Sequence, residues 1–300
     1  MKSFLSQLNI VLALFGACAA STTAYAADKL PVVASFSILG DLVTIVGGDR
    51  VTVTTLVAAD SDAHIFEPKP ADVKSITQTK LLVMNGLGFE PWAAKLAKSA
   101  GYKGATVVAT QGIQPLLMTA DGKKSQDPHA WQNPRNVMVY VRNIAAALTQ
   151  LDPAGAALFK GHSEAYVKEL EALDTWAVSQ FAGLPPAKRK IITSHDAFGY
   201  FAAQYQVTFL APQGMSTESE PSAKQVAQLI RQLKAEKIKA VFIENMTNPK
   251  LLAQLAKDAD VVPAGTLHAD ALSAADKPGA SYLQMMRHNV TQLAAGMQKN

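Results

Sequence analysis

The chain has 300 residues, with 28 Lys and Arg against 24 Asp and Glu, and a formal net charge of +4. This small basic excess argues against a nucleic-acid-binding protein, which would show a concentrated basic stripe. The only cysteine, Cys18, lies in the N-terminal segment. A mature chain without that segment has no disulfide and no thiolate ligand, so a metal site must use His, Asp, Glu or backbone oxygen.

The N-terminal residues carry the pattern of an export signal. One lysine precedes an apolar run over residues 10–20, and the tripeptide AYA follows at residues 24–26. This pattern is typical of a secretory signal that is cut after its last small residue. We therefore expect residues 1–26 to be a signal peptide and the mature protein, with a net charge of +3 after loss of one of 28 basic residues, to be periplasmic. The alternative is a lipid anchor on Cys18.

Short β-rich runs alternate with helical patterns in both halves of the mature chain. Such alternation, with strands apolar on both faces, predicts βα units and mostly parallel sheets. We expect an α/β fold with two βα-type lobes, a long rigid helix between them and a metal site in the cleft between the lobes. The expected strands are residues 31–36, 51–57, 80–86, 105–110, 189–195, 207–212, 239–245 and 261–267.

A helix-rich stretch separates the two halves. Its longest uninterrupted pattern, from Pro153 to Phe181, predicts a helix about 43 Å long at 1.5 Å per residue. A helix of this length is a stiffer connector than a Gly/Ser-rich linker. We therefore expect an N-terminal lobe at 27–151, a linking helix at 152–186 and a C-terminal lobe at 187–300.

The placement of the six histidines is the most informative feature of the sequence. Ligands of open α/β sheets bind in loops beyond the carboxyl ends of the strands, and four of the histidines lie in or near such loops. His162 and His288 lie within helical patterns and are expected to face solvent. The four histidines in loops are His64, His129, His195 and His268.

Three neutral imidazoles and one carboxylate make a closed tetrahedral shell for zinc, with metal–nitrogen distances of about 2.0 to 2.1 Å. Asp270 is the leading carboxylate, because the sequence DALS that it opens is typical of a capped turn just past a strand end. Such a turn would aim the Asp270 side chain at the cleft. His268, Glu244 and Glu67 are the competing ligands, and sequence spacing alone does not choose among them.

Seven motifs point to a known family. In their order along nearly the whole mature chain, the motifs resemble those of the solute-binding proteins of zinc- and manganese-importing ABC transporters, called cluster A-I or family 9. The resemblance implies two lobes joined by a rigid helix, one buried metal ion, a membrane permease as partner and a monomeric protein. The motifs are DAHIFEP, LLVMNGLGFEPW, DPHAWQNP, TSHDAFGYF, QGMSTESEPSA, VFIENM and LHADALS.

Carried over residue by residue, the resemblance makes His64 and His129 the metal ligands of the first lobe, and His195 and Asp270 those of the second. Zinc-type relatives have His at the third position, where manganese-type relatives usually have Glu. We therefore expect Zn²⁺ as the transported ligand, with Mn²⁺ as the alternative. Three departures from the family pattern are Ala63, where Pro is common, His268, where an aromatic residue is common, and the absence of a histidine-rich loop before His129.

These observations predict a periplasmic zinc-binding protein that delivers the ion to an ABC permease and is not an enzyme. We expect carboxylates such as Glu67, Asp127 or Asp196 to orient the imidazoles. A zinc hydrolase is the rival, with three His ligands, a metal-bound water and a glutamate base. Against this rival, Asp270 fills the fourth position and the sequence lacks HExxH. A surface adhesin is a third alternative, which no motif supports.

Overall fold

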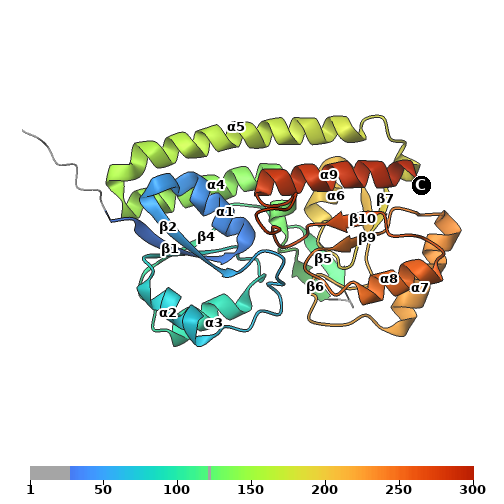
Figure 1. Cartoon of the computed structure of the whole chain (residues 1–300), viewed down its shortest axis with the longest axis horizontal. Helices are drawn as coiled ribbons and strands as arrows, with labels where there is room; N and C mark the ends of the chain where they lie inside the picture. Colours follow the sequence, from blue (N-terminus) through green and yellow to red (C-terminus); the bar gives the residue numbers. More distant parts are fainter. Residues whose placement is uncertain (1–27, 121–122) are drawn as a thin grey trace, which may run out of the picture.

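The computed structural model describes residues 28–120 and 123–300. The expected signal peptide and the alternative anchor Cys18 lie outside these described residues. Across the described ranges, every helix is too short or too polar to cross a membrane. Two α/β lobes lie side by side, and long helices run above both of them (Figure 1).

The first lobe is built on a four-stranded parallel sheet in the order β2-β1-β3-β4. In the central strand β1, Val32, Val33, Ala34 and Phe36 are all nearly fully buried, as expected for a parallel sheet covered on both faces. Helix α1 lies above this sheet, and α2 and α3 lie below it (Figure 1). The elements are β1 (Leu30–Phe36), α1 (Ser37–Gly47), β2 (Val51–Val57), α2 (Pro70–Gln78), β3 (Leu81–Met84), α3 (Pro91–Ser99) and β4 (Ala105–Val108).

The second lobe repeats this strand order with shorter strands. Its parallel pairs β7–β8 and β9–β10 are joined by an isolated bridge between Ile192 and Val241, which gives the order β8-β7-β9-β10. Strand β7 ends earlier than expected because Ser194 N and His195 N donate to the Glu244 side chain instead of a neighbouring strand. The elements are β7 (Lys190–Ile192), α6 (Gly199–Tyr205), β8 (Thr208–Leu210), α7 (Ala223–Glu236), β9 (Phe242–Glu244), α8 (Lys250–Asp258) and β10 (Gly265–Leu267).

Three long helices connect the lobes. Helix α4 (Pro134–Leu151) begins at a proline, and the Asn133 side chain caps it by accepting a hydrogen bond from Arg135 N. Helix α5 (Ala156–Phe181) is about 39 Å long and runs along the top of both lobes (Figure 1). It is the long helix that the sequence predicted between the two lobes. Helix α9 (Tyr282–Gln298) lies beneath it. Short 3-10 helices are Gly48–Arg50, Ala130–Gln132, Pro153–Gly155 and Pro186–Lys188.

One hairpin was not expected from the sequence. Strands β5 (Leu117–Ala120) and β6 (Lys123–Gln126) pair antiparallel, although the segment is polar and lacks the alternation typical of a strand. Leu117 is 66% exposed, so burial of a hydrophobic face does not select this hairpin. The dipeptide Asp121-Gly122, between the two strands in the sequence, is typical of a two-residue hairpin loop and is the local signal that could have predicted this hairpin.

Hydrophobic side chains form two separate cores. The larger one joins the first lobe, the long helices and the helix-covered face of the second lobe, and it includes Trp131, Tyr140 and Phe242. The smaller one lies on the other face of the second-lobe sheet. It contains Ile192 of β7 together with leucines of α7 and α8, which are Leu229, Leu233, Leu252 and Leu255.

Candidate metal centre

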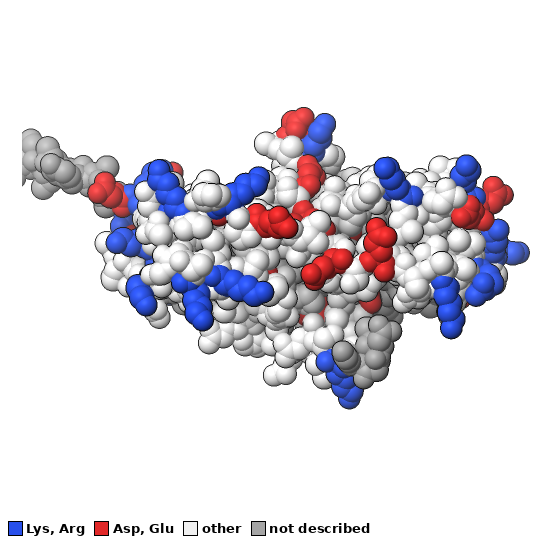
Figure 2. Space-filling view, turned by 90° about the horizontal axis from the view of Figure 1, so that it is seen from below, with Lys and Arg blue, Asp and Glu red and all other residues white. Residues whose placement is uncertain are grey.

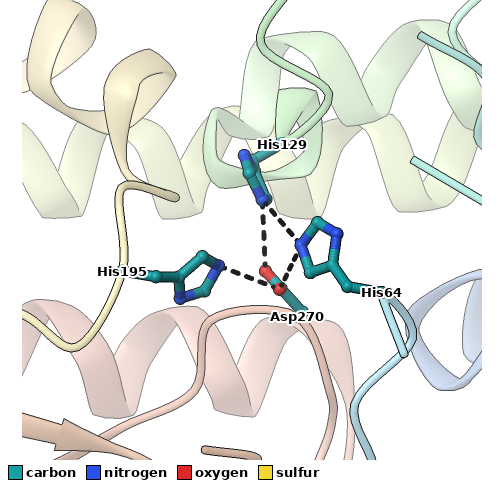
Figure 3. A group of neighbouring side chains, drawn as sticks. All are labelled: His64, His129, His195 and Asp270. Atoms are coloured by element: carbon teal, nitrogen blue, oxygen red, sulfur yellow. Dashed lines mark hydrogen bonds and ion pairs between the residues drawn. The ribbon is translucent and has the colours of Figure 1, made fainter. Parts of the chain in front are cut away.

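The structure brings together all four side chains that the sequence singled out as metal ligands. Each of His64, His129, His195 and Asp270 offers one ligand atom, and these atoms all lie within 4.8 Å of one another. His64 follows β2, His195 follows β7 and Asp270 follows β10, whereas His129 immediately precedes the 3-10 helix Ala130–Gln132. Figure 3 shows the four side chains converging on one point from separate segments of both lobes.

The distances between the ligand atoms match a tetrahedral metal shell. Asp270 Oδ2 lies 3.2 Å from His64 Nε2 and 3.1 Å from His195 Nε2. The His129 Nε2 atom lies 3.4 Å from His64 Nε2 and 3.8 Å from Asp270 Oδ1. Ligands at about 2.0 to 2.1 Å from a tetrahedral zinc ion lie about 3.3 to 3.4 Å apart, so small adjustments would complete the shell.

Burial makes these polar atoms costly unless something binds them. The side chains of His129, His195 and Asp270 are 0% exposed and that of His64 is 6% exposed. Within the part of the chain that the structure describes, His195 Nε2 and both carboxylate oxygens of Asp270 make no aligned hydrogen bond. Each unsatisfied buried polar group costs about 1 to 3 kcal/mol. A divalent cation bound at this point would satisfy all three atoms.

Two buried carboxylates hold imidazoles from the side away from the centre. Asp127 Oδ1 lies 2.7 Å from His129 Nδ1 and also accepts from His129 N. Glu244 Oε2 lies 2.5 Å from His195 Nδ1. Because a carboxylate accepts hydrogen bonds, the neutral form of each imidazole carries its proton on Nδ1 and presents the lone pair of Nε2 to a metal.

The His64 loop is held by its backbone. Asp62 Oδ1 accepts a hydrogen bond from His64 N at 2.8 Å, the same two-residue spacing that joins Asp127 to His129 N. Asp62 was not among the site residues expected from the sequence. The repeated pattern Asp-x-His, in DAH and DPH, is the signal that could have identified it.

The charges around the site favour a cation. Burial opposes a charge on His195, but the carboxylates of Glu244 and Asp270 overcome this effect and hold the pKa of that imidazole well above its usual value. Burial raises the pKa of Asp270, but the imidazoles of His195 and His129 outweigh it and hold that pKa well below its usual value. Asp270 is therefore a carboxylate at neutral pH, ready to bind a metal ion.

Aromatic rings fix the first-lobe histidines against the segment that carries Asp270. Phe89 packs against the rings of His64 and His129, with centroids 4.8 and 6.0 Å away. Trp131 donates from Nε1 to the carbonyl oxygen of Ala269 at 2.8 Å. Trp131 is completely buried and packs in the core, and its indole also anchors the residue next to Asp270.

The other candidates from the sequence lie outside the cluster. Glu244 supports His195 through its hydrogen bonds, and His268 packs against His288, with ring centroids 5.0 Å apart. Of the three carboxylates expected to orient imidazoles, only Asp127 does so. Glu67 is exposed, and the Asp196 side chain makes no hydrogen bond to a ligand among the described residues. His162 is half-buried, with Nδ1 3.2 Å from Val46 O, and so faces solvent only in part.

A buried cluster of three imidazoles and one carboxylate, placed between two α/β lobes, defines a two-lobed metal-binding protein. The chain belongs to the family described as "Zinc-uptake complex component A periplasmic", whose sequence profile matches residues 32–296. This is a family of transporter substrate-binding proteins, which is not an enzyme class. The resemblance inferred from the seven motifs is confirmed.

Three known proteins illustrate the similarity. The chain is 33% identical to the "Iron ABC transporter substrate-binding lipoprotein MtsA" of Streptococcus pyogenes serotype M1, over 100% of this chain and 97% of that protein. It is 31% identical to the "Manganese ABC transporter substrate-binding lipoprotein PsaA" of Streptococcus pneumoniae, over 100% of both chains. The structure of the periplasmic zinc binding protein TroA from Treponema pallidum matches with a TM-score of 0.85 and 26% identity, over 90% of this chain and 99% of that one.

Proposed function

We propose that this protein binds Zn²⁺ with high affinity through His64, His129, His195 and Asp270, and delivers the ion to the permease of an ABC importer. The observation that carries the proposal is the buried cluster of four ligand atoms within 4.8 Å of one another. Family membership supports the transport role, because the family consists of substrate-binding components of such importers. The ion is cargo, so the site must release it as well as bind it.

The donor set supports zinc as the preferred ion. Imidazole nitrogen suits zinc, whereas manganese favours harder oxygen donors, and three of the four ligands here are imidazoles. Asp127 and Glu244 make His129 and His195 better donors by accepting the protons on their Nδ1 atoms. The names of the relatives include iron, manganese and zinc, so the choice of metal depends on the residues of this chain.

Manganese is the second candidate, and one observation favours it. Both oxygens of Asp270 face the centre, Oδ2 toward His64 and His195 and Oδ1 toward His129. A carboxylate that binds through both oxygens would raise the coordination number above four, which suits an ion with octahedral preference. The same four residues would then hold the ion.

We propose that the mature protein works on the outer side of the cytoplasmic membrane. Two of the relatives are named lipoproteins, which supports a lipid on Cys18, while the AYA tripeptide at 24–26 supports cleavage after Ala26. The mass of the protein isolated from its native host distinguishes the two. A diacylglycerol adduct on Cys18 would show that the protein is lipid-anchored, and an N-terminus at Ala27 would show that the signal peptide is cut after Ala26.

The test of the proposal is a metal measurement on the purified protein. We expect zinc to copurify in about one equivalent, and zinc to displace manganese in competition calorimetry. Asp270→Asn should weaken zinc affinity more than about a hundredfold, whereas Asp276→Asn, at an exposed carboxylate of the same segment, should leave it unchanged. Absence of binding to either metal would overturn the transport role. Tighter binding of manganese than of zinc would overturn the choice of metal.

A further inference from the structure

A cavity of about 480 Å³ reaches the candidate metal centre at one ligand only. His64 lines it, and the other three ligands do not. Its walls come from both lobes, with Leu87 and Phe89 on one side and Met215 and Glu218 on the other. A water molecule occupies about 30 Å³ of liquid, so the cavity has room for a cation with its hydration shell.

The exposure of the ligands points to the same side. His64 is the only one of the four ligand side chains with any exposed surface, at 6%. An ion that arrives through the cavity therefore meets His64 before His129, His195 or Asp270. The other three ligand side chains are fully buried, so His64 is where this cavity meets the centre.

Charge on this side of the molecule favours cations. Figure 2 views the molecule from below, and Asp and Glu side chains gather over the middle of this face, between Lys and Arg at both ends. Glu218, an exposed residue, lines the cavity, and β6, which also contributes to its lining, lies toward the same side in Figure 1. A carboxylate at an opening raises the local concentration of cations and their rate of association.

The cavity wall of the first lobe is a strained turn. Gly86, Leu87 and Gly88 all have positive φ, at 88°, 55° and 82°, a conformation that is unfavourable for leucine. The Glu90 carboxylate holds the turn by accepting from Asn85 N and Gly86 N. Strained backbone persists where the surrounding structure holds it, and it is concentrated at binding sites and gates.

Hydrogen bonds between the lobes oppose a different route, in which the lobes separate. Thr217 donates to Asp62 Oδ2 at 2.6 Å, and Asn245 donates to Asp60 Oδ1 at 2.8 Å. At the other side of the interface, Tyr282 N donates to the side chain of Asp41. Separating the lobes would break these contacts together, whereas passage through the cavity would leave them in place.

We propose that this cavity is the access route by which the cation reaches and leaves the centre. Glu218 attracts the ion at the opening, His64 is the first ligand to bind it, and Leu87 and Met215 form the facing walls that limit the rate. The inference rests on the proposed function, because it assigns the path to the same site. It requires no separation of the lobes.

The first test narrows the cavity and measures exchange of zinc alone. In Met215→Trp, the larger side chain should slow zinc association and zinc dissociation by the same factor, at least about tenfold, with Kd within about twofold of the original. A chromogenic chelator in stopped flow gives both rates, and calorimetric competition gives Kd. The matched control is Ile65→Trp, because Ile65 is next to His64 in the chain and 56% exposed but does not line the cavity.

The second test removes charge without changing shape. Glu218→Gln should lower the zinc association rate a few-fold at low ionic strength and leave dissociation unchanged, and the effect should vanish in high salt. Glu220→Gln is the control, since Glu220 lies in the same segment but lines a neighbouring cavity. Glu218→Gln also tests the access route if Met215→Trp does not fold.

The outcomes separate the route from the function. If the unsubstituted protein binds zinc but Met215→Trp exchanges it at unchanged rates, the route is wrong and the lobes must part. An unchanged association rate in Glu218→Gln at low salt overturns the role of that carboxylate. If the unsubstituted protein binds neither zinc nor manganese, the proposed function itself is wrong.

Discussion

The two lobes share a strand order but differ in how their outer helices pack. In the first lobe, Ile76 of α2 and Leu96 of α3 belong to the same core as the long helices. In the second lobe, Leu233 of α7 and Leu255 of α8 pack around Ile192 in a core of their own. The outer helices of the first lobe therefore share one hydrophobic core with the long helices, whereas the outer helices of the second lobe pack in a separate core.

This difference matters because the candidate ligands of both lobes lie against the larger core. Ala269 and Leu272, which flank Asp270, belong to it, as do Ala130 and Trp131, which follow His129. The α7–α8 layer packs around Ile192, three residues before His195, but not around the other three candidate ligands, so we expect it to loosen with little effect on the candidate metal centre. Disturbing the first lobe, in contrast, should disturb the metal centre.

The largest expected effect tests whether the lobes contribute equally to metal binding. His64→Ala in the first lobe and His195→Ala in the second should each weaken zinc affinity more than about a hundredfold, because each removes one of four ligands. Calorimetry or chelator competition measures this. His162→Ala is the control, since His162 lies in α5 and outside the cluster. Loss of affinity in the variant of one lobe alone would show that the other lobe supplies no ligand.

The next prediction separates the two cores. Ile76→Ala and Leu255→Ala each remove buried methyl groups, at a cost of about 2 to 5 kcal/mol. We expect Ile76→Ala to lower the free energy of global unfolding in denaturant. For Leu255→Ala we expect faster hydrogen exchange confined to α7 and α8, with zinc affinity retained. Uniformly faster exchange in Leu255→Ala would mean that the two cores unfold as one unit.

Two buried glutamates illustrate a further difference between the lobes. Glu244 in the second lobe is next to the His195 imidazole, whereas Glu90 in the first lobe accepts only from neutral donors, among them Ser35 Oγ at 3.0 Å. Burial raises the pKa of Glu90 from 4.5 to about 7, although hydrogen bonds from Asn85, Ser35 and Gly86 partly oppose the shift.

The raised pKa of Glu90 predicts a pH dependence of stability in the metal-free protein. Because folded Glu90 keeps its proton to higher pH than unfolded Glu90, its stabilising contribution is complete below about pH 4.5 and is lost as pH rises through about 7. The loss is about 3 kcal/mol. In denaturant unfolding, the free energy of unfolding should decrease less between pH 5 and pH 8 in Glu90→Gln than in the original protein. Glu67→Gln, at an exposed carboxylate, should follow the original protein. Identical pH profiles for the original protein, Glu90→Gln and Glu67→Gln would contradict the assignment of this pH dependence to Glu90.

The smallest expected effect compares the carboxylates behind the ligands. Glu244→Gln and Asp127→Asn should each weaken zinc affinity about tenfold to a hundredfold, because the acceptor that orients each imidazole loses its negative charge. We expect Glu244→Gln to be the more damaging, since Glu244 accepts from two backbone N–H groups, those of Ser194 and His195, whereas Asp127 accepts from one, that of His129. If chelator competition shows that Asp127→Asn weakens zinc affinity more than Glu244→Gln does, the hydrogen bond from His129 to Asp127 matters more than that from His195 to Glu244.

Much of the fold could be predicted from local patterns. The first-lobe strands lie within two residues of the expected positions. The strands β1 and β3 are short, largely apolar and buried on both faces, and β2 and β4 are rich in the β-branched residues Val and Thr. Predictions were weaker where a tertiary contact replaces a local one. The strand expected at 189–195 ends at Ile192 because later backbone donors bind Glu244, and the strand expected at 261–267 begins only at Gly265, after an exposed Val262 and Pro263.

The sequence by itself determined the α/β class, the long linking helix, the family and the four residues proposed as ligands, because periodicity and motifs are local properties of the chain. Only the tertiary structure decided which carboxylates support the imidazoles, how the cores divide and where a cavity reaches His64. Glu244 is 49 residues from His195, and Asp270 is 206 residues from His64. Such partners are set by how strands and helices pack across the cleft, which no local pattern encodes.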